Sequence, residues 1–296
     1  MNTKHIRCLI GALLLSSCML YAAEEGAEVV SAEELSAGEA PAPVSVWSFN
    51  IQTFGATKMA RPSVKEVLAD VLSRADLCAI QEVRSSKSTA PMDQLMALLP
   101  SGRESVLGEP EGRSSYKEQY WLIYDSAKWT VLASAVYPDP GDLFVREPMG
   151  FYLRAGDFDC ILLDNHIAPD DAAAEIAALP AAAAWFAELW DESDIIIVGD
   201  FNADGSYYNE DALADVFPPG DWLIIIGNDV DTTVASSSNT YDRIIISASA
   251  VEDYTGDCGV FRFDEEEGFA DLGILANRVS DHYPIWALFY VDRDTD

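Results

Sequence analysis

The most constraining feature of this sequence is a succession of short apolar runs, each bounded by glycine or polar residues. The runs lie at 45–51, 77–83, 119–125, 129–137, 151–156, 160–166, 194–202, 221–227, 242–249 and 284–291. Their length and their β-branched and aromatic content predict β-strands. Helical patterns are fewer and fall at 62–75, around 91–99, at 170–190 and near 207–215. Many strands with few helices between them favour an α/β fold with two sheets packed face to face and helices outside.

The longest helical pattern, 170–190, begins beside two aspartates that can cap it, Asp170 and Asp171. Pro180 lies in its middle. Because proline lacks the amide hydrogen that a helix interior uses, we expect a kink or a division of this helix at Pro180.

The first 43 residues have the composition of a targeting sequence followed by a flexible tether. Lys4 and Arg7 precede an apolar run, 8–15, that is too short to span a bilayer. We therefore expect a signal peptide at 1–17, of the bacterial lipoprotein type because Leu15-Ser16-Ser17-Cys18 resembles a lipobox whose cysteine is lipidated. An ordinary secretory signal cut near Ala22 or Ala23 is the alternative, and both predict export. Residues 18–43 contain six glutamates and no lysine or arginine, which is typical of a flexible, self-repelling tether before a domain at 44–296.

The charge balance excludes one class of protein. The chain has 18 lysine and arginine residues against 50 aspartate and glutamate residues, a formal net charge of −32. A broad basic surface that holds nucleic acid is therefore excluded. A hydrolase that turns nucleic acid over is not, because local cations and bound divalent metals can supply the positive charge.

Polar side chains interrupt the predicted strands at their ends. They are Asn50, Glu82, Glu118, His166, Asp200, Asn202, Asp242, Asp281 and His282. Strand ends at one rim of a sandwich are where a rigid scaffold can gather residues that are distant in the sequence. Both histidines that follow the leader belong to this set, so we expect them to share one site.

The chemistry of this set is coherent. The oxygens of Glu82, Asp281 and Asn50 are hard ligands suited to Mg²⁺ or Mn²⁺. Two imidazoles can act as general base and general acid when water attacks a phosphodiester. Glu118 and Asp242 are carboxylates that can hold them. Asp200 and Asn202 are two residues apart on an extended chain and can point into the site together.

Eight segments, in order along nearly all of 44–291, resemble the deoxyribonuclease I family of the endonuclease/exonuclease/phosphatase superfamily. They are FNIQTFGATKM (49–59), IQEVRSS (80–86), GEPEGRSSYKEQY (108–120), REP (146–148), HIAPDDAAAEI (166–176), GDFNADGSY (199–207), TYDRIII (240–246) and SDHYPI (280–285). GDFN and SDH are typical of the whole superfamily, whereas QEVR and GR-SYKE are more specific to this family. The resemblance implies a four-layer α/β sandwich. It also implies Mg²⁺-dependent, largely sequence-independent DNA cleavage that leaves 5′-phosphate ends.

The same resemblance implies roles for the site residues. Glu82 looks like the principal metal ligand, with Asn50, Asp281 and Asp200 beside it. His166, paired with Glu118, resembles the general acid, and His282, paired with Asp242, resembles the base. Because the two pairs are nearly symmetric, the direction of this assignment stays open. Asp200 and Asn202 would also orient the scissile phosphate and the nucleophile. The implied DNA contacts are Arg84 and Tyr116 in the minor groove, with Arg113, Arg146 and Ser114 at its rim.

Two structural calcium sites are implied by the resemblance alone. Asp139, Asp142, Phe144 (through its carbonyl) and Glu147 resemble one site; Asp231, Thr233 and Ser237 resemble the other. The positions that form the family's disulfide are Gly205 and Asn239 here. The segment SVLGEP does not keep the features of the actin contact, so we expect no actin binding.

The leading function is thus an exported DNA endonuclease, acting as a monomer and possessing a lipid anchor at Cys18 if the lipobox is used. One alternative is a phosphodiesterase of the same superfamily that acts on a phospholipid or another phosphate ester, as a sphingomyelinase does. Another is a non-catalytic binding protein on this fold. The lipid alternative predicts an exposed aromatic hairpin, which the sequence does not contain. The binding alternative is disfavoured because every expected metal and acid–base position is kept.

Overall fold

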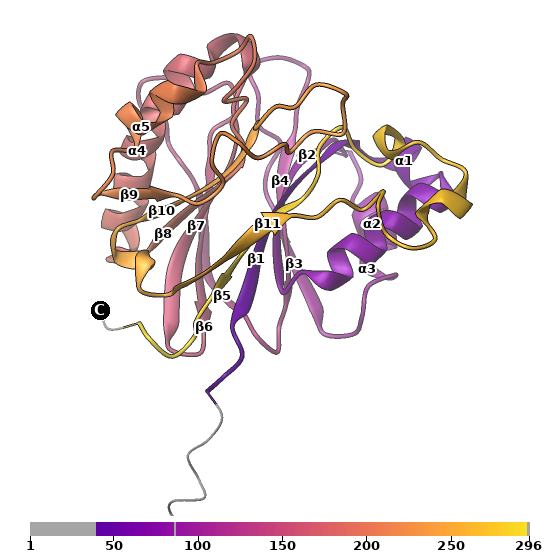
Figure 1. Cartoon of the computed structure of the whole chain (residues 1–296), viewed down its shortest axis with the longest axis horizontal. Helices are drawn as coiled ribbons and strands as arrows, with labels where there is room; N and C mark the ends of the chain where they lie inside the picture. Colours follow the sequence, from indigo (N-terminus) through magenta and orange to yellow (C-terminus); the bar gives the residue numbers. More distant parts are fainter. Residues whose placement is uncertain (1–39, 86, 295–296) are drawn as a thin grey trace, which may run out of the picture. The chain divides into compact units, whose positions relative to one another are not determined.

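The computed structural model describes residues 40–85 and 87–294, and Figure 1 shows how the strands lie between two groups of helices. The signal peptide expected at 1–17 and residues 18–39 of the tether expected at 18–43 lie outside the described residues. The domain expected from residue 44 onward begins with a strand at Val44.

Within the described ranges, twelve strands form two six-stranded sheets. The first has the order β11 (Tyr254–Val260), β12 (Ile285–Phe289), β1 (Val44–Phe54), β2 (Leu77–Val83), β4 (Gln119–Asp125) and β3 (Arg103–Leu107). The second has the order β5 (Thr130–Val136), β6 (Met149–Ala155), β7 (Phe158–His166), β8 (Ile195–Asp200), β10 (Asp242–Ser247) and β9 (Trp222–Ile224). The central pairs β1–β2 and β7–β8 are parallel, and the other neighbours are antiparallel.

Helices cover the outer face of each sheet. On the first sheet lie α1 (Ala56–Met59), α2 (Pro62–Arg74) and α3 (Ala90–Met96). On the second lie α4 (Ala172–Trp190) and α5 (Leu213–Val216). Short 3-10 helices occur at Pro169–Asp171, Glu210–Ala212, Ser249–Val251, Phe269–Leu272 and Ala276–Arg278. The four-layer α/β sandwich is thereby confirmed, as Figure 1 also shows.

Three apolar layers hold the sandwich together. Alternate residues of β1, β2, β4, β6, β7 and β10 fill the space between the sheets, among them Val46, Leu122 and Phe151. The opposite faces of the same strands pack on the helices. Strands buried on both faces read as continuous apolar runs, which is why the sequence pattern located them.

Three expectations about local structure need correction. The edge strands β3 and β11 escaped sequence analysis because their residues are polar or glycine-rich, RESVL and YTGDCGV. The run at 221–227 forms only the three residues of β9. Helix α4 continues through Pro180, so the division is wrong and the kink stays a prediction; Ile176, Leu179 and Phe186 bury its face against the second sheet and outweigh one lost hydrogen bond.

Helix α4, with the 3-10 turn before it, is long and apolar enough to cross a membrane by length and composition. Its buried residues include Ala182 and Ala183 as well as the charged Glu175. The Glu175 carboxylate accepts hydrogen bonds from the backbone amides of Val145 and Ala168. These contacts identify α4 as a helix of the folded core.

Candidate active site

Two histidine–carboxylate pairs lie at one end of the sandwich. His166 ends β7, and its Nδ1 atom lies 2.7 Å from Oε2 of Glu118, just before β4. His282 precedes β12, and its Nδ1 atom lies 2.8 Å from Oδ2 of Asp242, the first residue of β10. The four side chains are buried, with at most 7% of each residue exposed. A carboxylate at Nδ1 favours the hydrogen on that nitrogen, so Nε2 of each ring is directed into the site.

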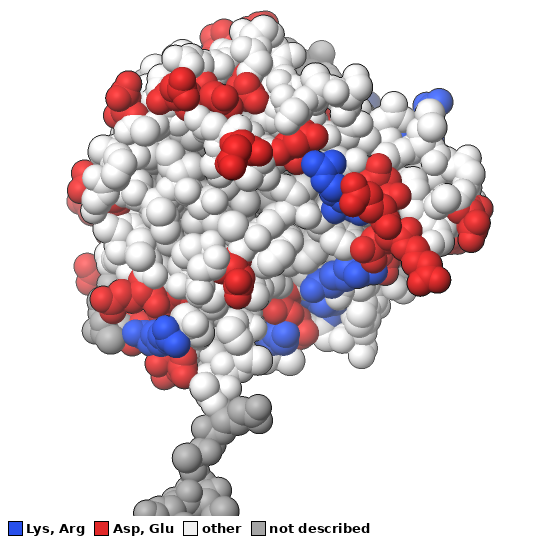
Figure 2. Space-filling model, viewed as in Figure 1, with Lys and Arg blue, Asp and Glu red and all other residues white. Residues whose placement is uncertain are grey.

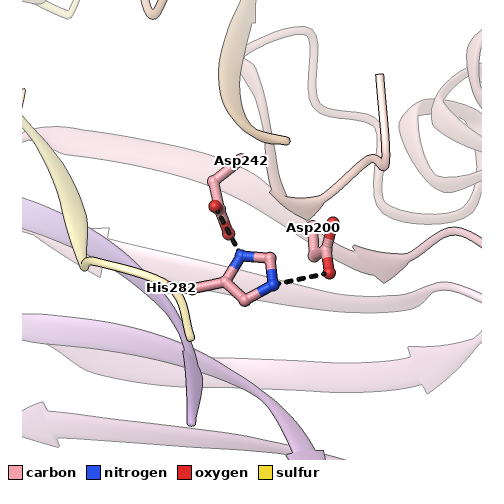
Figure 3. Close-up of side chains that lie close together, drawn as sticks. All are labelled: Asp200, Asp242 and His282. Carbon is pink, nitrogen blue, oxygen red and sulfur yellow. Dashed lines mark hydrogen bonds and ion pairs between the residues drawn. The ribbon is translucent and has the colours of Figure 1, made fainter. Parts of the chain in front are cut away.

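Asp200, at the end of β8, lies between the two imidazoles. Its Oδ2 atom is 3.5 Å from Nε2 of His166 and 3.5 Å from Nε2 of His282. Figure 3 shows His282 between the carboxylates of Asp200 and Asp242. The expected set therefore converges on one carboxylate, although its members come from both sheets.

The oxygen donors expected to hold a metal meet at the same place. The Nδ2 atom of Asn50 donates to Oε1 of Glu82 at 3.1 Å and to Oδ2 of Asp200 at 3.0 Å. Oδ1 of Asp281 lies 3.9 Å from Nε2 of His282, and this side chain is 51% exposed. Asp200, Asp242 and His282 also have ligand atoms close enough to hold one ion. Carboxylate-rich donors of this kind fit Mg²⁺ or Mn²⁺, although Asn50 presents its amide nitrogen to the carboxylates and would have to turn to offer oxygen.

The backbone around these donors is strained. Gln52, Thr53, Glu82 and Asn202 adopt positive φ angles of 45°, 51°, 62° and 46°. Residues other than glycine rarely occupy this region, and such strain gathers at functional sites. Here the conformation aims side chains, because the amide and hydroxyl of Thr53 donate to Oε2 of Glu82 at 2.8 and 3.2 Å.

The surroundings shift the pKa of one member of each pair towards its charged form: Glu118 in the first pair and His282 in the second. Burial alone would raise the pKa of Glu118, but the hydrogen bond from His166 and the guanidinium of Arg146 outweigh it and lower this pKa below its usual value. Burial alone would lower the pKa of His282, yet the carboxylates of Asp242 and Asp200 raise it well above its usual value.

Asn202 contacts Asp200 at the end of β8 and the residue that follows His166. Its backbone amide donates to Oδ1 of Asp200 at 3.0 Å, and its side-chain amide donates to the carbonyl of Ile167 at 2.9 Å. It therefore fixes the segment that follows His166.

The residues expected to contact DNA occupy two environments. The Arg84 guanidinium stacks 3.4 Å above the ring of Tyr116, which is 43% exposed, and Oγ of Ser114 accepts from the amide of Tyr116. Arg113 forms an exposed ion pair with Asp142 at 3.1 Å. Arg146 differs: its side chain is only 11% exposed, and Nε donates to the carbonyl of His166 at 3.0 Å. Arg146 thus contacts both members of the His166–Glu118 pair, the backbone of His166 and the carboxylate of Glu118.

The two expected calcium sets lie in loops, and calcium stays a prediction for both. Oδ2 of Asp139 accepts from the amide of Phe144 at 2.8 Å. Glu147 lies against Glu111, and burial together with this neighbour raises the pKa of Glu111 to about 7.

In the second set the donors already have protein partners. Oδ1 of Asp231 accepts from the amide of Thr233, and the Thr233 hydroxyl also lies 3.1 Å from the carbonyl of Ser237. Oδ2 of Asp231 faces Arg262 at 3.4 Å. The positive charge of Arg262 therefore lies beside the Asp231 carboxylate.

Sequence analysis overlooked residues that position the site. The Tyr120 hydroxyl accepts from the amide of His166 at 3.0 Å. Gln81 donates to Oδ1 of the fully buried Asp164 at 2.6 Å and so joins β2 to β7 beneath the site. Only the polarity of Gln81 and Asp164 within apolar strands hinted at these roles.

Comparisons with known proteins find similar chains over most of the sequence. The model of the Endonuclease/Exonuclease/phosphatase family matches residues 47–282. Deoxyribonuclease-1 of Sus scrofa is 34% identical over 253 residues, covering 80% of this chain and 88% of the relative. Deoxyribonuclease-1 of Homo sapiens is 33% identical over 257 residues, covering 82% and 90%. The solved structure of D. rerio TDP2 complexed with single strand DNA product shares the fold, with a TM-score of 0.61 and 16% identity over 84% of this chain and 99% of that chain.

Proposed function

Since the chain belongs to the endonuclease/exonuclease/phosphatase family, as a member similar to deoxyribonuclease I, we propose that it is a metal-dependent endonuclease. It hydrolyses DNA phosphodiester bonds with little sequence specificity and leaves 5′-phosphate ends. The observation that carries this proposal is the pair of buried histidine–carboxylate units directed at Asp200. Hydrolysis of a phosphodiester uses a general base for the attacking water and a general acid for the departing oxygen, and the two histidines place both groups in one site.

The donor set supports a divalent cation as cofactor. Glu82, Asp200, Asp281 and Asn50 would hold Mg²⁺ or Mn²⁺. When bound, the ion supplies positive charge that offsets the charge developing on the phosphate oxygens. We also propose the loop residues that resemble calcium ligands as structural Ca²⁺ sites, in which the Glu111–Glu147 contact would be relieved by a cation.

The two histidines divide the proton transfers. His282, held at Nδ1 by Asp242, accepts the proton of the attacking water at Nε2. His166, held at Nδ1 by Glu118, donates a proton from Nε2 to the departing 3′ oxygen. The carboxylate of Glu118, whose pKa is lowered, holds the His166 ring at Nδ1 so that Nε2 faces the leaving group.

Asp242→Asn provides a pH test of this division. Asp242 stabilises protonated His282, so its removal lowers the pKa of His282. Because the base must be neutral, we expect the acidic limb of the kcat/KM–pH profile to move to lower pH. The rate itself should fall by about 100-fold as the ring loses its partner. Asp229→Asn, an exposed change of the same charge, should leave the profile in place. A shift of the alkaline limb instead would make His282 the acid, and no shift would contradict its role.

The stacked Arg84–Tyr116 pair supports contact with the minor groove. The guanidinium of Arg84, which is half-buried, is attracted by the negative potential of that groove, and the Tyr116 ring can pack against a sugar. Acidic side chains spread over the face in Figure 2, while basic ones gather in a few places. Binding is therefore weak, sensitive to salt and assisted by divalent ions.

Supercoiled plasmid tests the proposed function. The purified protein should nick it in Mg²⁺ with Ca²⁺, and EDTA should abolish nicking. If the folded protein leaves plasmid intact at low salt, the proposal is wrong, and phospholipids and small phosphate esters become the substrates to examine.

We further propose that the chain is exported and anchored through a lipid on Cys18, and that it acts as a monomer without binding actin. The support is the lipobox-like segment and the acidic tether. Mass spectrometry of the mature protein should find a lipidated N-terminal cysteine; a chain that retains residues 1–17 would contradict export.

A further inference from the structure

Lys58 is a lysine buried beside the proposed metal site. It belongs to α1 and is only 6% exposed. Its Nζ atom donates to the carbonyl of Ile51 at 2.6 Å and to the carbonyl of Val279 at 2.7 Å. One ammonium group therefore joins two segments that are 228 positions apart in the numbering, the end of β1 and the loop that leads to Asp281.

Ser280 joins the same two segments from the other side. It is fully buried, and its hydroxyl donates to the carbonyl of Asn50 at 2.6 Å. The Ser280 hydroxyl oxygen also accepts a hydrogen bond from the amide of His282 at 3.1 Å. The carbonyls of the consecutive residues Asn50 and Ile51 are thus held by Ser280 and Lys58.

These two contacts lie next to candidate metal ligands. Asn50 carries one carbonyl and also the amide that bridges Glu82 and Asp200. Val279 and Ser280 directly precede Asp281 and His282. Burial lowers the pKa of Lys58 to about 8, while the carboxylates of Asp281 and Glu82 oppose this shift, so the ammonium lies within their field.

We propose that Lys58 and Ser280 are positioning residues that hold Asn50 and Asp281 at the separation a divalent cation requires. This inference rests on the proposed function, because it concerns the same site. Residues that orient metal ligands through hydrogen bonds set metal affinity, and their loss typically weakens it by 10–100-fold. The carbonyls of Asn50, Ile51 and Val279, which would each lose a donor, would also loosen the joint between β1 and the loop.

The sign of the change separates positioning from a simple charge effect. If Lys58 acted only through its charge, Lys58→Met would remove repulsion towards the cation and tighten metal binding, while Ser280→Ala would do nothing. If both residues position the ligands, both variants weaken binding.

Mn²⁺ titration calorimetry of the full chain without DNA tests the proposal. We expect Lys58→Met and Ser280→Ala each to weaken Mn²⁺ binding by about 10-fold or more. The double variant should weaken it by less than the product of the single effects, because both residues stabilise one joint. Lys65→Met, which removes a positive charge from the neighbouring helix α2, is the matched control and should bind as the wild type does.

Plasmid nicking supplies a second readout. At saturating Mg²⁺ both variants should recover most of kcat with an unchanged KM for DNA, while the metal concentration at half-maximal rate rises. Ser280→Ala removes a single hydroxyl, so it keeps the test decisive if Lys58→Met does not fold.

Unchanged Mn²⁺ affinity in the folded variants, or tighter binding in Lys58→Met, overturns the proposal. Wild-type protein that binds Mn²⁺ but does not nick DNA would instead contradict the proposed function and leave the positioning role standing. Wild-type protein that binds no Mn²⁺ would overturn both.

Discussion

His166→Ala should slow DNA nicking by about 10³-fold without unfolding the protein. A positioned general acid typically contributes 10²–10⁴-fold, and alanine leaves no group at the place of Nε2 that could protonate the leaving oxygen. Initial rates of plasmid nicking at saturating Mg²⁺ measure the effect, and thermal unfolding checks the fold.

Glu118→Gln gives the companion measurement. Glutamine keeps the shape of Glu118 but removes the charge that holds the His166 ring, so we expect a smaller loss, of about 10²-fold. Glu188→Gln, an exposed change on α4, should have no effect. A loss below tenfold in His166→Ala would remove this histidine from the proposed mechanism.

Asp200→Asn should abolish nicking and metal binding together. Among the described residues, Asp200 is the carboxylate that approaches both imidazoles and the Asn50 amide. Because altering residues that merely orient a ligand costs 10–100-fold in metal affinity, loss of a ligand charge should cost at least about 100-fold. We expect the nicking rate to fall by at least about 10³-fold.

Calorimetry with Mn²⁺ and nicking assays check this prediction separately. Asp215→Asn, an exposed substitution on α5, is the control for the lost charge. If Asp200→Asn binds Mn²⁺ as tightly as the wild type, Asp200 is not a ligand, and Glu82 with Asp281 would have to hold the ion without it.

The strands that frame the site could be predicted because their pattern is local. β2 and β4 lie where the apolar runs at 77–83 and 119–125 placed them. Each run buries both faces, so its boundaries coincide with the first polar residues, and those residues are the site. The edge strands β3 and β11 have one unpaired side and few apolar residues, and local patterning could not reveal them.

The contacts of the candidate site could be predicted only in part. Arg146 was expected at a DNA-facing rim, yet its guanidinium lies mostly buried against His166. No pattern around Lys58 distinguishes it from a solvent-exposed lysine, because its burial depends on Val279 in a distant loop.

The positions that resemble the family's disulfide are neighbours even though neither is cysteine. A Cβ atom at Gly205 would lie 3.2 Å from Oδ1 of Asn239. The amide of Thr240 donates to Oδ2 of Asp204 at 2.8 Å and joins the same two loops. The hydrogen bond between Thr240 and Asp204 thus joins the two loops that a disulfide at Gly205 and Asn239 would join.

The sequence alone determined the strand-rich α/β class, the acidic balance and the polar residues at the strand ends, because each depends on side chains that are near one another along the chain. Only the tertiary structure decided how those ends meet. Burial, the field around His282 and the contact of Lys58 with Val279 arise from segments far apart in the sequence, and only the packing of the folded chain brings them within hydrogen-bond distance.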